Sequence, residues 1–297
     1  MSRTARLLFL LLLSLGAATL LATGGLMPFP ARGQAQSLTL KPVAATAPDI
    51  PFSDEESQTE QQLLAFANDA RRRAGVPPLR VDAGLSLAAR AHAQAMLEAR
   101  RLAHQFPGEP ALSQRLAAAT RLLLDQAAEN VAFDYDAQHG HEHLMLSPPH
   151  RANLLNPAYN VVGLGVVRNV DRLYIVQDFG HALPNYSADE VKARIALAVQ
   201  RRRRQVNRSQ LSLKDLPNVD QAACSMAQAD RLATSPIRNF AQRYTVLTYT
   251  SLRPEVLPRQ ALQPVSSRSL RSFSVGACYA RTETYPNGVY WVVLSLD

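Results

Sequence analysis

The spacing of apolar side chains divides the chain into helices that are followed by strands. Apolar residues between 59 and 73 recur every three or four positions, which predicts a helix, and Gly75 with Pro77 and Pro78 predicts its end. Asp82 is a favourable N-cap for the next helix. The predicted helices cover residues 59–73, 83–101, 113–126 and 137–146.

Two strands are predicted after these helices. Residues 161–167 and 172–179 are rich in β-branched and aromatic side chains, and residues 169–171 separate them as a hairpin turn. Gly163 and Gly165 in the first of these strands indicate a bulge or the close approach of another backbone. Helices followed by strands are typical of an α+β fold.

The C-terminal part of the chain repeats some of this pattern. Ser187 and Glu190 form a capping box, which predicts a connecting helix and basic linker over residues 187–215. Residues 216–297 contain another strand–turn–strand pattern, over 273–280 and 289–294, and are predicted to be a smaller α+β unit. This unit is either a degenerate, shortened second copy of the first or an unrelated fold.

The N-terminus has the pattern of an export signal. Arg3 and Arg6 precede an uncharged apolar run over residues 7–29, which predicts a signal peptide over residues 1–35 with cleavage after Ala35. The run is also long enough to span a bilayer, so an uncleaved N-terminal anchor is the alternative. Residues 36–57 are rich in Pro, Ala, Ser and Thr and are predicted to be a linker. The sequence therefore favours a secreted, periplasmic or cell-envelope protein.

Charge and cysteine content distinguish the C-terminal part of the chain from the rest. Residues 52–186 carry 12 Lys and Arg against 15 Asp and Glu, whereas residues 187–297 carry 16 against 8. The net positive charge of the chain thus comes from its C-terminal part, and it does not indicate binding of nucleic acid. Cys224 and Cys278 are the only cysteines, and in an exported protein they are expected to form a disulfide, with two buried thiols as the alternative.

Four segments between residues 88 and 157 carry the most specific motifs. They are residues 88–96, Leu102-Ala103-His104, Glu129-Asn130-Val131-Ala132, and Ser147-Pro148-Pro149-His150-Arg151-Ala152-Asn153. Each alone is a weak signal, whereas their order and spacing together are specific. They resemble the CAP superfamily, also called the SCP or PR-1-like family, and its bacterial secreted branch in particular. The resemblance covers residues 59–181, within a predicted domain over residues 58–186.

The resemblance implies an α-β-α sandwich with a cleft lined by His104, Glu129 and His150. Asn130, Arg151 and Asn153 would support the loops of this cleft. Two imidazoles and an orienting carboxylate can hold a divalent cation such as Zn²⁺, Ca²⁺ or Mg²⁺, with His104 and His150 as its ligands, although no cofactor is required. A Glu129–His150 pair could instead activate water as a general base. The third interpretation is a hydrogen-bonded network without a ligand.

The sequence departs from the family pattern near His150. Ser147 stands where the eukaryotic branch has a second glutamate, and Pro149 replaces a glycine. Because proline fixes φ and removes a backbone donor, we expect a different loop geometry there. The missing glutamate weakens the prediction of catalysis.

Two other clusters have a functional and a structural interpretation. His139 and His143 share a helix face and could bind a metal, but a polar, solvent-facing helix start is favoured. Arg201, Arg202, Arg203 and Arg204 could contact an anionic surface, but a solvated helix end is favoured. His92 lies on an apolar helix face and is expected to be a hydrogen-bonded core residue.

Three functions remain open from the sequence. The favoured one is a non-catalytic module that binds a small ligand, a lipid, an ion or an envelope polymer. The second is a metal-assisted hydrolase of a peptide or envelope polymer, in which Glu129 and His150 are the candidate catalytic residues. The third is an envelope scaffold that binds through the basic C-terminal unit. Whether the protein is an enzyme is left undecided at this level, because a fold does not determine a reaction.

Overall fold

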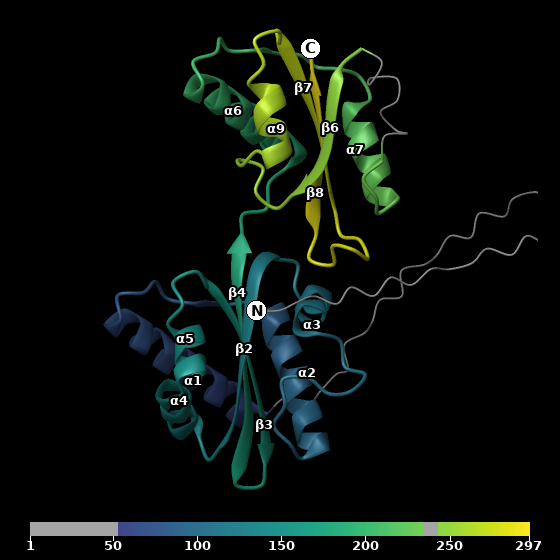
Figure 1. The fold of residues 1–297 in the computed structure, drawn as a ribbon. Coiled ribbons are helices and arrows are strands. Elements are labelled where there is room, and N and C mark those ends of the chain that lie inside the picture. The colour runs from purple at the N-terminus through teal and green to yellow at the C-terminus, as the bar shows by residue number, and fades with distance from the viewer. Residues whose placement is uncertain (1–52, 234–242) are drawn as a thin grey trace, which may run out of the picture. The chain divides into compact units, whose positions relative to one another are not determined.

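The computed structural model describes residues 53–233 and 243–297, which form two four-stranded sheets with helices on both faces of each (Figure 1). The predicted signal peptide, and the predicted linker up to residue 52, lie outside the described residues. No helix in the described ranges has both the length and the apolar character needed to cross a membrane.

The first sheet has the strand order β1-β3-β4-β2. Its strands are β1 (Arg80–Val81), β2 (Leu123–Asp134), β3 (Val161–Asn169) and β4 (Arg172–Leu183). β1 pairs with β3 in parallel, and the other pairs are antiparallel. β2 is therefore an edge strand, and its two faces are reached from both helical layers.

Helices cover both faces of this sheet, as Figure 1 shows. One layer contains α1 (Asp54–Arg73), α4 (Ala137–Leu146) and α5 (Pro148–Leu154), and the other contains α2 (Ala83–Ala99) and α3 (Leu112–Ala119). We call this sheet with α1 to α5 the first unit. The α-β-α sandwich implied by the resemblance is thus confirmed.

Gly163 and Gly165 of β3 allow the sheet to approach α2 closely. A Cβ on Gly163 would collide with Leu85, and one on Gly165 would collide with the backbone of Ala89. Only a residue without a side chain fits at these two positions. The close-approach alternative is therefore the correct one, because β3 runs over nine residues without a register shift.

The prediction of a helix over residues 113–126 is wrong in its second half. α3 ends at Ala119, Thr120 adopts an extended backbone, and β2 begins at Leu123. Pairing with β4 along almost its whole length outweighs the local helical spacing of the leucines. The consequence for the site is that Glu129 lies in a strand and not in a loop.

α5 is a helix that the sequence did not predict. Pro148 and Pro149 occupy its first turn, where a missing backbone N–H costs nothing and a fixed φ favours helix entry. The two prolines that follow α4 therefore begin α5. α1 also starts earlier than predicted, at Asp54, because Ser53 and Glu56 form a capping box.

The second sheet has the order β5-β7-β8-β6. Its strands are β5 (Ser212–Leu213), β6 (Thr245–Ser251), β7 (Ser272–Ala280) and β8 (Val289–Leu296). α6 (Ala188–Gln205) and α9 (Arg259–Val265) pack on one face, and α7 (Val219–Gln228) packs on the other. We call this sheet with α6, α7 and α9 the second unit. The helix predicted as a connector, α6, is thus also a layer of this unit.

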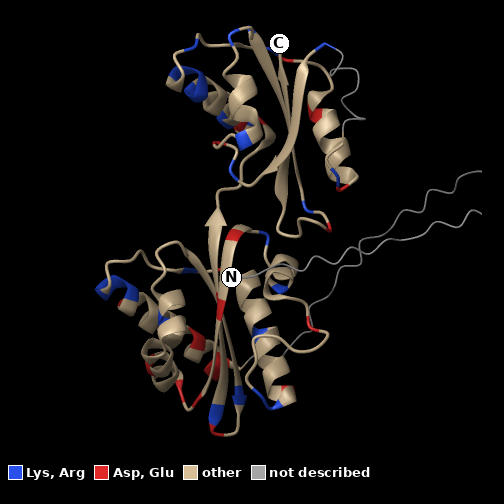
Figure 2. Cartoon of the chain, viewed as in Figure 1, with Lys and Arg blue, Asp and Glu red and all other residues tan. Residues whose placement is uncertain are grey.

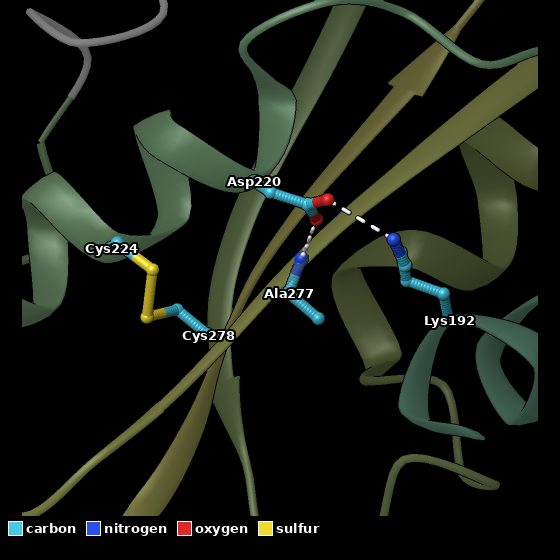
Figure 3. The surroundings of a disulfide bond; sticks show 5 residues. All are labelled: Lys192, Asp220, Cys224, Ala277 and Cys278. Atoms are coloured by element: carbon cyan, nitrogen blue, oxygen red, sulfur yellow. Dashed lines mark hydrogen bonds and ion pairs between the residues drawn. A yellow bond between two sulfur atoms is a disulfide. The ribbon is translucent and has the colours of Figure 1, made fainter. Parts of the chain in front are cut away.

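A disulfide joins Cys224 of α7 to Cys278 of β7, as predicted (Figure 3). The bond closes a loop with a sequence separation of 54 residues. In the chain-entropy estimate such a crosslink stabilises the folded state by about 4 kcal/mol, because it restricts the unfolded chain.

Candidate functional site

The edge strand β2 carries the centre of the candidate site on two consecutive residues. Side chains alternate between the faces of a strand, so Glu129 faces the layer of α2 and α3 while Asn130 faces the layer of α5. Both side chains are buried, Glu129 with 7% and Asn130 with 0% of its surface exposed. The Glu-Asn motif therefore holds one loop on each side of the sheet edge.

Glu129 is the anionic centre of one face. Its Oε1 lies 2.9 Å from Nδ1 of His104, and its Oε2 accepts a hydrogen bond of 2.7 Å from Nη2 of Arg115. His104 comes from the segment after α2, and Arg115 comes from α3. Both carboxylate oxygens of Glu129 are therefore occupied by side chains of the same chain.

His92 and Glu109 hold the segment that presents His104. His92 Nδ1 lies 2.6 Å from Glu109 Oε1, and its Nε2 lies 2.8 Å from the carbonyl oxygen of Ala103. Glu109 also accepts hydrogen bonds from the backbone N–H of Phe106 and from Arg115. Burial raises the pKa of Glu109, but these hydrogen bonds outweigh it and hold that pKa below the ordinary value. His92 is thus the hydrogen-bonded core residue that the sequence predicted.

Asn130 fixes α5 from the other face. Its Nδ2 donates to the carbonyl oxygen of His150 at 3.1 Å, and its Oδ1 accepts from Nδ2 of Asn153 at 2.9 Å. Asn153 Nδ2 also approaches the carbonyl oxygen of Glu129 at 3.4 Å. Asn130 and Asn153, which were predicted to support the loops of the cleft, thus link α5 to β2, whereas Arg151 is exposed on α5.

His104 and His150 are brought close enough to influence one another. Burial lowers the pKa of His150, and the neighbouring charge of His104 lowers it further. His150 is therefore a neutral imidazole at neutral pH, able to accept a hydrogen bond or to coordinate a metal. The His104 side chain is 59% exposed, and its Nδ1 is held by Glu129, so that its Nε2 is the nitrogen left for a ligand.

Asp178 belongs to this cluster, although the sequence analysis did not single it out. It pairs with Glu129 across β2 and β4, and it is 1% exposed. Burial raises the pKa of Asp178 well above its ordinary value, and the charge of Glu129 raises it further. The only signal for it in the sequence was an acidic residue within a mostly apolar strand.

The other predicted metal ligands lie on α4. His139 pairs with Asp136 and His143 pairs with Asp134, each through Nδ1. Within residues 53–233 and 243–297, no three His, Cys, Asp or Glu side chains are arranged to hold a metal ion together. A cation at any of these histidines would therefore need water or a bound molecule to complete its coordination.

The arginine run at the end of α6 is not uniformly exposed. Figure 2 shows basic residues gathered at this helix end. Arg203 is buried, and its guanidinium donates to the carbonyl oxygens of Ser209, Val265 and Ser267. Contact with an anionic surface thus remains a prediction for Arg201, Arg202 and Arg204 only.

Comparisons with known proteins agree with this architecture. The family model of the cysteine-rich secretory protein family, CAP, matches residues 64–179. Two curated proteins of Bacillus subtilis (strain 168) are each 30% identical to this chain: the uncharacterized membrane protein YlbC over 141 residues and the uncharacterized protein YkwD over 154. The matches cover 47% and 46% of this chain, but only 39% and 58% of those two proteins.

Solved structures give similar matches. An extracellular SCP-domain protein from Bacillus anthracis str. Ames is 25% identical with a TM-score of 0.40, and the match covers 44% of this chain and 45% of that one. A cysteine-rich secretory protein from Staphylococcus aureus subsp. aureus Mu50 is 22% identical with a TM-score of 0.36, covering 44% and 41%. The match of the family model places a CAP superfamily domain over residues 64–179, which confirms the resemblance seen in the sequence.

Proposed function

We propose that the CAP domain is a binding module of an exported protein, and that the imidazoles of His104 and His150 contact its ligand. The observation that carries the proposal is the state of Glu129, whose two oxygens are held by His104 and Arg115. This carboxylate orients an exposed histidine. Both of its oxygens are engaged by side chains of the fold, so the imidazoles and not this carboxylate are the groups that meet a ligand.

A divalent cation is the ligand class that fits these donors best. A histidine that gives one ring nitrogen to a carboxylate and presents the other outward is the usual arrangement of a metal ligand. Neutral imidazoles suit Zn²⁺, whereas Ca²⁺ and Mg²⁺ prefer oxygen donors. We therefore expect Zn²⁺ to bind more tightly than Ca²⁺ or Mg²⁺, with water or a second molecule filling the remaining positions. Such an ion could also anchor a small ligand or an envelope polymer.

Hydrolysis is the weaker candidate for the same residues. A general base needs an oxygen or nitrogen within hydrogen-bond reach of the attacking water. Glu129 already accepts a hydrogen bond from Arg115, and Ser147 stands at the position of the second glutamate of the eukaryotic branch. An orienting role for Glu129 explains the same contacts without a reaction.

Export of the protein is part of the proposal. The signal-like segment over residues 1–35 supports it, and so does the disulfide, which persists in oxidising compartments. A cleaved signal and an N-terminal anchor are both compatible with a binding module at the cell envelope.

A thermal-shift titration with Zn²⁺, Ca²⁺ and Mg²⁺ tests the site. A ligand that binds only the folded state raises the melting temperature by mass action, and at one hundred times its Kd it adds about 2.7 kcal/mol. We expect a Zn²⁺-dependent rise in the wild-type protein and its loss in His104→Ala/His150→Ala.

The pair His139→Ala/His143→Ala is a matched control, because it removes two exposed histidines from α4 instead. This variant should keep the Zn²⁺ effect. If it loses the effect while His104→Ala/His150→Ala keeps it, the site assignment is wrong. No rise with any of the three ions, in any of the proteins, would contradict the cation as ligand.

A further inference from the structure

Asp178 is a buried acid that no other role in the fold explains. It lies on β4 directly opposite Glu129, and the two residues point to the same face of the sheet. Its Oδ1 has no hydrogen-bond partner among the described residues. A buried carboxylate oxygen without a donor is costly, so the residue needs either a proton or a ligand.

The groups around Asp178 provide too little positive charge for three carboxylates. Glu129 on β2 and Glu109 before α3 are acidic, while Arg115 on α3 is the fixed cation and His92 on α2 contacts Glu109. Arg115 already donates to both Glu109 and Glu129, and His104 donates to Glu129. Arg115 is thus the one fixed cation beside three carboxylates, and two of them already share its donors.

We propose that Asp178 is a neutral carboxylic acid that donates a hydrogen bond to Glu129, and that it positions the Glu129 carboxylate against His104. The proton lies on Asp178 and not on Glu129, because the donors of Arg115 and His104 both stabilise a charge on Glu129. A hydrogen bond from an acid to a carboxylate is charge-assisted and stronger than one between neutral groups. Asp178 is thus a positioning residue of the site.

This arrangement determines the state of His104. An anionic Glu129 keeps a proton on Nδ1 of His104, so that Nε2 is the ring nitrogen left for a ligand. If Asp178 ionised, two neighbouring carboxylates would repel each other and disturb the contact between Glu129 and His104. The role of Asp178 in ligand binding rests on the proposed function, whereas its protonation can be measured without any ligand.

The pH dependence of the protein's stability should show whether Asp178 holds a proton. Burial and the neighbouring Glu129 hold the pKa of Asp178 above its value in the unfolded chain. The folded state then binds more protons than the unfolded state above about pH 4, and stability falls as pH rises until the raised pKa is passed. One such group lowers the folding equilibrium constant about tenfold per pH unit, or about 1.4 kcal/mol.

The test compares Asp178→Asn with Asp171→Asn, which changes an exposed aspartate in the turn between β3 and β4. Asparagine has nearly the same shape and can donate to Glu129, but it carries no titrating proton. We expect Asp178→Asn to lose the tenfold-per-unit decline and to be more stable than the wild type at pH 7 to 8. Asp171→Asn should keep the wild-type profile. An unchanged profile in Asp178→Asn would overturn the proposal.

Infrared spectroscopy of the wild-type protein at neutral pH gives an independent measurement. A carboxylic acid C=O band should be present in the wild type, retained in Asp171→Asn and lost in Asp178→Asn. Its absence from the wild type, or its loss in Glu129→Gln but not in Asp178→Asn, would show that Asp178 does not hold the proton. If the band is present but no ion binds, the carboxyl pair stands and only the proposed ligand fails.

Discussion

The two units are built on one plan but differ where the candidate site lies. The sheet orders β1-β3-β4-β2 and β5-β7-β8-β6 match strand for strand, with one parallel pair in each. α6 and α7 take the places of α1 and α2 on the two faces. The sequence left open whether the second unit is a shortened copy, and the shared topology favours that alternative.

The agreement extends to single contacts. A buried arginine in the last turn of α1 and of α6, Arg71 and Arg203, donates through Nε to the carbonyl oxygen six residues later. Asn68 forms two hydrogen bonds with the backbone of Leu79, and Gln200 forms the same two with Leu211. These side chains hold the helix against the chain that enters the first strand, and they serve the scaffold in both units.

The sheet registers also identify what replaces the site. Through β4 and β8, the cross-strand pair Glu129–Asp178 corresponds to Val246–Ser295, and Asn130–Gln177 corresponds to Leu247–Leu294. No histidine occurs after His181 in the sequence. The second unit thus keeps the scaffold contacts and lacks the polar pairs, which is the expected result if those pairs serve binding and not folding.

The largest effect in this comparison is expected when the disulfide is removed, because only the second unit has one. Replacing Cys224 and Cys278 by serine should destabilise that unit by about 4 kcal/mol. Trp291, the only tryptophan, is buried in β8 and reports the second unit by fluorescence. We expect the fluorescence transition in urea to move to lower concentration, while the imidazole NMR signal of His104 keeps its wild-type midpoint. An equal shift of both signals would contradict two separate scaffolds.

A somewhat smaller effect is expected at the paired arginines. Arg71→Ala leaves the carbonyl oxygens of Pro77, Leu154, Asn156 and Tyr159 without their donor, and Arg203→Ala does the same to three carbonyls. Each substitution should cost about 3 kcal/mol in its own unit, because buried acceptors lose their partners. Urea unfolding, followed by the two signals above, measures both losses.

The exposed neighbours Arg72→Ala and Arg204→Ala are the controls for these substitutions. They should change stability by less than about 0.5 kcal/mol. If Arg203→Ala behaves like Arg204→Ala, the two helix ends do not share a structural role.

The same comparison explains what the sequence could and could not predict. Capping residues, glycines and apolar periodicity predicted α2, α4, α6 and the β3–β4 hairpin, because these signals are local. The grouping of His104, Glu129 and His150 came from the resemblance to a family. Asp178 was missed because its importance depends on the register of β4 against β2, which joins residues 49 positions apart. The apolar pattern of β4 alone does not specify its register against a strand that is not joined to it by a short turn.

The smallest expected effect concerns an ion pair whose two charges are exchanged between the units. Glu60 of α1 pairs with Arg90 of α2, whereas Lys192 of α6 pairs with Asp220 of α7 (Figure 3). Asp220 also accepts the backbone N–H of Ala277, and Glu60 has a backbone hydrogen bond with Val166, which occupies the same register position in β3. In each unit a carboxylate thus satisfies the same strand position, although it comes from opposite helices.

If the scaffold requires only one carboxylate and one cation at this position, the first unit should accept the arrangement of the second. Arg90→Asp alone places two acids together and should cost about 2 kcal/mol, as should Glu60→Lys, which places two cations together. The double variant Glu60→Lys/Arg90→Asp should recover more than half of the summed loss, because Asp at position 90 can accept from Val166 as Asp220 does from Ala277. Losses that simply add in the double variant would mean that the helices, and not the charges, determine this contact. Urea unfolding of the four proteins completes the cycle, and the NMR signal of His104 shows whether the site is disturbed.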